Sequence, residues 1–137
     1  MDRRKFLIGA LTLAGVPGPA LALAGTEATP HEVLVALGTG KTVFLEVYDA
    51  DCAACSAQSG VIASLMSNSP GLAQAVSFLA VDFDAHEGSE LFKVLTVDSS
   101  GTLVVLKGGM EFGRLVGETD TAAIRELVQK AYSVATG

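Results

Sequence analysis

The chain has 137 residues, of which half are hydrophobic, and it carries 15 acidic against 9 basic residues. This length suits one compact domain and is too short for two once a leader is removed. The net charge of −6 leaves no basic surface for nucleic acid, and an anionic membrane surface repels such a chain. These values exclude nucleic-acid binding, so the expected partners are proteins or small molecules.

The first 24 residues follow the order of a secretory signal peptide. A cationic start over residues 2–5 leads into an apolar run over residues 6–16 and then into Ala-Leu-Ala at 22–24. The apolar run is too short to cross a hydrocarbon core of about 30 Å, so no stable membrane insertion is expected after cleavage. The sequence therefore predicts a signal peptide over residues 1–24 and a single domain over residues 25–137.

Arg3-Arg4, followed by Phe6-Leu7, resembles the twin-arginine signal that exports folded cargo. Ordinary secretion is the alternative. Both routes lead out of a bacterial cytoplasm, so the predicted location is the periplasm.

Local signals divide the rest of the chain into alternating helices and strands, after a loose segment over residues 25–28. Thr29, Pro30 and Glu32 predict a helix start, with Thr as N-cap, Pro in the first turn and Glu completing a capping box. Periodicity and turn signals predict a helix over 30–37, a strand over 42–48, and a helix from 52 to about 67 with one further turn at 72–75. They then predict a strand over 76–82, a helix over 88–95, a hairpin of strands 102–106 and 110–116, and a helix from 119 or 120 onward.

This order of elements predicts an α/β fold. Strands that are joined through helices pair in parallel by right-handed crossovers, whereas a hairpin adds an antiparallel edge. We therefore expect a mixed sheet between two layers of helices.

The two cysteines of the chain, Cys52 and Cys55, lie where an apolar strand runs out and a helix begins. Two thiols at this spacing on a first helical turn can close a small-loop disulfide, and the free N–H groups there stabilise a thiolate on the first sulfur. The pattern is typical of a redox site with thiol partners. A structural disulfide and metal binding are the alternatives, although two cysteines cannot fill a tetrahedral site. The sequence indicates no cofactor and no metal ligand set.

The Cys-x-x-Cys motif, its flanking strand and helix, and the later hairpin together resemble the thioredoxin family over residues 29–132. The resemblance implies a thioredoxin-like three-layer α/β/α fold, with a mixed sheet and a C-terminal β-hairpin plus helix. It also implies that Cys52 is the exposed nucleophile and that Cys55 resolves the mixed disulfide, the two forming the redox-active disulfide.

Glu46 matches the family's buried acid, six residues before the nucleophile, which moves a proton on and off the resolving thiol. Because Glu46 stands in an otherwise apolar strand, desolvation should raise its pKa and suit it to act as a general base. The alternative is a Glu at the wet end of the strand.

Two departures from the family pattern bear on function. Gly101 stands where the family has a cis-proline before Thr102; the resemblance makes both residues part of the substrate-binding loop, and a glycine there is expected to be less preorganised. Asp51, with Asp49 beside it, replaces the usual tryptophan. These acids oppose the Cys52 thiolate and so favour the disulfide, which makes the reduced form a better electron donor.

The sequence thus predicts an exported thiol:disulfide oxidoreductase, a reductant or mild exchanger acting on protein disulfide or thiol clients. The resemblance implies a membrane thiol transporter as electron donor. The competing hypothesis is a redox-inactive thioredoxin-like binding module or adapter with a structural disulfide.

Overall fold

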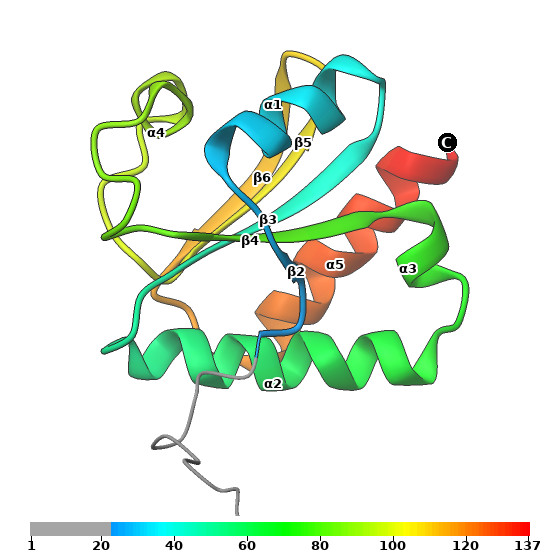
Figure 1. The fold of residues 1–137 in the computed structure, drawn as a ribbon. Coiled ribbons are helices and arrows are strands. Elements are labelled where there is room, and N and C mark those ends of the chain that lie inside the picture. Colours follow the sequence, from blue (N-terminus) through cyan, green and yellow to red (C-terminus); the bar gives the residue numbers. More distant parts are fainter. Residues whose placement is uncertain (1–22) are drawn as a thin grey trace, which may run out of the picture.

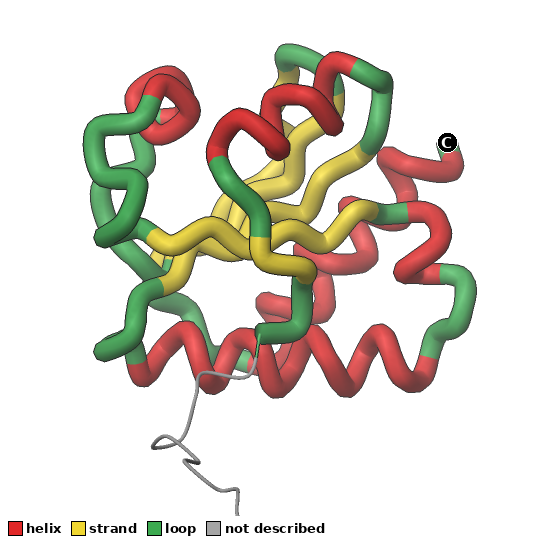
Figure 2. The backbone as a smooth tube through the Cα atoms, in the orientation of Figure 1, coloured by secondary structure: helices red, strands yellow, loops and turns green. Residues whose placement is uncertain are grey.

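The computed structural model describes residues 23–137, whose path is shown in Figures 1 and 2. The predicted signal peptide lies outside the described residues except for Leu23 and Ala24. The elements are β2 (Thr26–Glu27), α1 (Pro30–Gly38), β3 (Thr42–Tyr48), α2 (Ala53–Asn68), α3 (Leu72–Ala75), β4 (Ser77–Asp82), α4 (Glu90–Leu95), β5 (Thr102–Lys107), β6 (Met110–Val116) and α5 (Thr121–Thr136).

The five strands form one mixed sheet in the order β2-β4-β3-β5-β6. Parallel pairing joins β3 to β4 and β2 to β4, whereas β5 pairs antiparallel with both β3 and β6. All seven residues of the central strand β3 are buried, because helices cover both of its faces. The predicted α/β class and the mixed sheet are therefore confirmed.

Helices cover the sheet on two sides, with α1 and α4 above it in Figure 1 and α2 and α5 below it. Each side has its own apolar cluster. The first cluster joins Val33 of α1 and Leu91 of α4 to the odd-numbered residues of β3. The second joins Ile62 of α2 and Ile124 of α5 to Phe44 on the opposite face of β3. The alternation of side chains along β3 therefore separates the two layers.

Capping residues set the helix starts. Thr29 and Glu32 make the predicted capping box of α1, with Glu32 N–H donating to Thr29 Oγ1 at 3.1 Å and Thr29 N–H to Glu32 Oε1 at 2.8 Å. Asp120 caps α5, and Ser89 caps α4, which begins at Glu90 and so later than predicted. No helix within residues 23–137 is long and apolar enough to cross a membrane.

The prediction of a loose segment over residues 25–28 is wrong. Thr26 and Glu27 pair with β4 as the short edge strand β2, and Ala28 N–H donates to Ala80 O at 2.8 Å. The Tyr48 hydroxyl also donates to Glu27 Oε2 at 2.6 Å. A two-residue strand has no periodic signal of its own, since its pairing comes from the open edge of β4.

Candidate functional site

Cys52 and Cys55 lie at the N-terminal tip of α2, at the end of the turn that follows β3. Asp51 N–H donates to Asp49 Oδ1 at 3.0 Å in this turn, which directs the chain from the strand into the helix. Cys52 is the N-cap of α2, and a disulfide joins it to Cys55 across a Cα–Cα distance of 5.2 Å. The structure therefore brings the two predicted cysteines together at a helix start.

The two sulfurs have different surroundings. Cys52 is half-buried, and its Sγ accepts the N–H of Cys55 at 3.0 Å, one of the donors that a helix start leaves free. Cys55 is only 3% exposed, and its Sγ lies 3.7 Å from the carbonyl oxygen of Val47. An incoming thiol can therefore reach Cys52 and not Cys55.

Glu46 lies on the face of β3 that α2 covers, and it is 3% exposed. Gly25 N–H donates to its Oε1 at 2.7 Å, and the Ser59 hydroxyl donates to its Oε2 at 2.7 Å. Burial raises the pKa of this carboxyl above its ordinary value, while the bonds from Ser59 and Gly25 partly offset the rise. The interpretation of Glu46 as a solvated residue at a strand end is excluded, and its raised pKa is as predicted.

Gly101 lies directly against the disulfide. A Cβ built on Gly101 would meet Cys52 Sγ at 3.8 Å, an ordinary van der Waals contact. The residue is buried, has a φ of +81°, and its N–H donates to Val47 O at 2.7 Å. Thr102, also buried, donates its hydroxyl to Ser99 O at 2.9 Å. The structure thus places Gly101 beside Cys52, and Thr102 follows it as the first residue of β5, with no cis peptide bond in residues 23–137.

Sequence reasoning missed two polar residues of α2 that hold this site, Gln58 and Ser59. Both are 2% exposed; Ser59 binds Glu46, and Gln58 Nε2 donates to Gly101 O and to Glu118 O, each at 2.9 Å. A sequence signal for them exists. They stand at helical spacing between Cys55 and Ile62, so the period predicts burial, and a buried polar side chain requires a partner.

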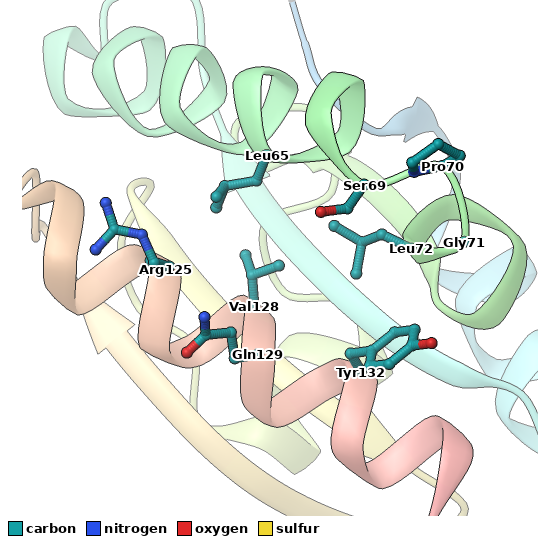
Figure 3. A pocket seen from close by; sticks show the side chains of 9 residues that line it. All are labelled: Leu65, Ser69, Pro70, Gly71, Leu72, Arg125, Val128, Gln129 and Tyr132. Atoms are coloured by element: carbon teal, nitrogen blue, oxygen red, sulfur yellow. The ribbon is translucent and has the colours of Figure 1, made fainter.

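An open pocket of about 370 Å³ lies at the other end of α2, between α2, α3 and α5. Figure 3 shows Leu65 and Leu72 facing Val128 and Tyr132 across it. Leu65 lies twelve positions after Ala53 on α2, which corresponds to about 18 Å along the helix axis. The pocket is therefore remote from the disulfide.

The residues described hold no group of three or more His, Cys, Asp or Glu side chains placed to bind a metal ion. Asp51 is exposed and directly precedes Cys52, and Asp49 lies in the same turn two positions earlier. The pKa of the Asp84 carboxyl is raised above its ordinary value, first by desolvation and then by the negative charges of Asp49, Asp82, Glu87 and Asp51. The surface around Cys52 is therefore acidic.

No protein-family model matches the chain, and no curated protein matches it. Solved thioredoxin structures do match. Thioredoxin O2 from Arabidopsis thaliana, in its oxidized state, is 25% identical with a TM-score of 0.61, over 80% of this chain and 95% of that one. Thioredoxin F from spinach chloroplast is 23% identical with a TM-score of 0.63, over 82% and 97%.

A third match, Trxlp from Edwardsiella tarda EIB202, is 24% identical with a TM-score of 0.63, over 75% of this chain and 98% of that one. These likenesses confirm the predicted three-layer fold, and the Cys52–Cys55 disulfide supports thiol:disulfide oxidoreductase activity. The chain has a thioredoxin-like fold, and its Cys-x-x-Cys disulfide lies at the tip of its first long helix.

Proposed function

We propose that the chain is an exported thiol:disulfide oxidoreductase that reduces or exchanges disulfides of protein clients. The observation that carries the proposal is the asymmetry of the pair: one sulfur is accessible at a helix start, and the other is buried directly behind it. A purely structural disulfide needs no such difference between its two sulfurs. The proposed site consists of Cys52, Cys55 and Glu46, with Gly101 and Thr102 beside it.

The reaction begins with the reduced pair. The Cys52 thiolate attacks a client disulfide; the client S–S bond breaks, a mixed disulfide forms on Cys52, and one client thiolate leaves. The Cys55 thiol then loses its proton, with Glu46 as the base, and its thiolate attacks Cys52 Sγ. The second client thiolate leaves and the Cys52–Cys55 bond forms again. Two electrons pass from the pair to the client.

The acidic surroundings of Cys52 support a reducing direction. Asp49 and Asp51 are adjacent to the motif, and negative charge disfavours a thiolate there. Destabilising the dithiol's ionised form favours the disulfide and makes the reduced pair a stronger donor. Continued turnover requires re-reduction, for which we propose a membrane thiol transporter.

Export to the periplasm, through a leader over residues 1–24, belongs to this proposal. It rests on the cationic start, the short apolar run and the Ala-Leu-Ala before Gly25. Fractionation of a bacterial host that expresses the full chain tests it. A shortened product in the periplasm supports export, and a product of full length that stays in the cytoplasm contradicts it.

Reduction of insulin by dithiothreitol tests the chemistry. We expect the chain to accelerate the reaction and Cys52→Ser to abolish the acceleration. We also expect Cys55→Ala to trap clients as stable mixed disulfides, because the attack that releases them is lost. An inert parent chain, or a trap that captures no more than a double-cysteine variant, favours the adapter hypothesis instead.

A further inference from the structure

We infer that Gln58 is a positioning residue of the thiol site, whose side chain fixes residues 98–101, here called the Gly101 loop, against the Cys52 sulfur. The inference rests on the proposed function, since it concerns how a protein client is held while it reacts. It assigns a role in client binding to a residue that touches neither sulfur through a hydrogen bond.

Gln58 joins three parts of the chain that are distant in sequence. Its side-chain amide donates to Gly101 O and to Glu118 O at 2.9 Å each, across separations of 43 and 60 residues. Both N–H groups of the amide are therefore used, and the side chain is only 2% exposed. α2 is thereby tied to the loop before β5 and to the turn after β6.

The Gly101 loop needs this support because a glycine loses more freedom than other residues when it is held in one conformation. Gly101 O accepts from Gly117 N–H at 2.9 Å as well as from Gln58, and Gly101 N–H donates to Val47 O at 2.7 Å. Every hydrogen-bonding group of Gly101 is thus engaged. Contrary to the expectation of a poorly preorganised loop, Gly101 is held by hydrogen bonds with three neighbours, one of them a side chain of α2.

The position of the loop matters to a client more than to a small thiol. A Cβ at Gly101 would lie 3.8 Å from Cys52 Sγ, and the neighbouring Ser99 and Ser100 are partly exposed. A client sulfur bonded to Cys52 brings its flanking backbone along this surface, so the position of the loop determines how well the client is bound. Dithiothreitol and glutathione have little or no flanking chain to place there. Loss of the Gln58 bonds should therefore affect protein clients selectively.

Insulin reduction by the full chain carrying Gln58→Met tests this role, because methionine keeps the length of the side chain and removes both donors. We expect KM for insulin to rise by about tenfold or more, with kcat nearly unchanged, since the loop holds the client and does not take part in bond exchange. The rate of exchange with oxidised glutathione should stay within about twofold of the parent rate, because no extended chain contacts the loop.

Ile62→Val is the matched control. Ile62 is fully buried one turn further along α2, and the structure shows it in the apolar cluster below the sheet rather than at the loop. This change lowers stability without removing a donor to Gly101. We expect it to leave KM for insulin unchanged.

Amide hydrogen exchange gives a second readout that is independent of activity. In the parent chain the N–H of Gly101 donates to Val47 O at 2.7 Å. This amide should exchange faster in Gln58→Met than in the parent, whereas in Ile62→Val it should not. Equal losses toward insulin and glutathione, or the same behaviour in Gln58→Met and Ile62→Val, would overturn the inference while the proposed function stands. A parent chain that is inert toward both disulfides overturns the two together.

Discussion

Gln58 and Ser59 are adjacent on α2, yet they hydrogen-bond to different segments of the chain. Ser59 binds Glu46 on β3, together with Gly25; we call these three residues the acid side. Gln58 binds Gly101 and Glu118, and these three residues form the loop side. The acid side holds a carboxyl whose pKa bears on the proposed deprotonation of Cys55. The loop side holds backbone whose position bears on the proposed binding of a client. In the proposed mechanism, one turn of helix supports proton transfer through Ser59 and client binding through Gln58, by separate hydrogen bonds.

Gly101→Pro should have the largest effect, and it falls on the loop side. Proline restores the residue type of the resembled family, but its ring fixes φ near −65° where the chain has +81°, and it removes the N–H that donates to Val47. We expect a loss of about 3 kcal/mol in the free energy of unfolding. Urea denaturation measures it.

Gly101→Ala is the milder companion of that variant. Alanine keeps the N–H, and its Cβ would lie at an ordinary contact distance of 3.8 Å from Cys52 Sγ. The positive φ remains unfavourable for a residue with a Cβ, so we expect the free energy of unfolding to fall by about 1 to 2 kcal/mol. A proline variant as stable as the parent would show that this loop readily adopts the other backbone geometry, contrary to the bonds described here.

Glu46→Gln tests the acid side. If Glu46 removes the proton of Cys55, the variant should resolve mixed disulfides about a hundredfold more slowly at neutral pH, because it lacks a base. Stopped-flow measurement of client release separates this step from the first attack. Glu126→Gln, an exposed carboxyl on α5, is the control. Unchanged release in Glu46→Gln would remove Glu46 from the mechanism and leave the loop side untouched.

The same Glu46→Gln variant has a pH-dependent effect on stability. Burial raises the pKa of Glu46 in the folded state above the ordinary value of 4.5, so the folded state binds the proton more tightly than the unfolded state. The free energy of unfolding of the parent therefore falls as pH rises from 4.5 through the folded pKa. We expect Glu46→Gln to gain stability over the parent across that range and to lose the advantage below pH 4.5. Urea denaturation at a series of pH values measures it, and a parallel pair of curves would contradict it.

Ser59→Ala should have a smaller effect. In the parent, the Ser59 hydroxyl donates to Glu46 Oε2 at 2.7 Å, and this bond lowers the pKa of Glu46. Because the variant lacks the bond, the pKa of Glu46 should rise further. Stability should fall by about 1 kcal/mol. The pH profile of client release should move to higher pH, with KM for insulin unchanged. Ser64→Ala, at an exposed position of α2, should change none of these. A rise in KM would show that the two sides are coupled.

The smallest expected effect is on the pKa of Glu46 when the chain begins at Gly25. In the structure Gly25 donates to Glu46 as an amide, but removal of the leader after Ala24 would make it a terminal ammonium. A positive charge on the same carboxylate lowers its pKa. We expect a lower pKa for Glu46 in a chain that begins at Gly25 than in one that begins at Leu23, measured by NMR titration. Identical titrations would mean that the segment shifts once it is cut.

Much of this architecture was predictable from local sequence. The capping box at Thr29, the hairpin of β5 and β6 and the alternation along β3 are set by neighbouring residues, and the helices and long strands fall close to where these signals place them. The Cys-x-x-Cys pair between strand and helix was likewise predictable, as was the buried carboxyl of Glu46 six residues earlier. Each of these signals lies within a few residues of the feature that it predicts.

The rest depends on contacts between distant segments. The sequence around Thr26 does not mark a strand, because β2 exists only where the edge of β4 accepts it. The pairing of Gly25 with Glu46 spans 21 residues, and the reach from Gln58 to Glu118 spans 60. Local chemistry determined that a thiol pair stands at a helix start. Only the packing of α2 on the sheet decided which donors hold the acid and the loop around it, because burial obliges polar groups to find partners wherever the fold brings them.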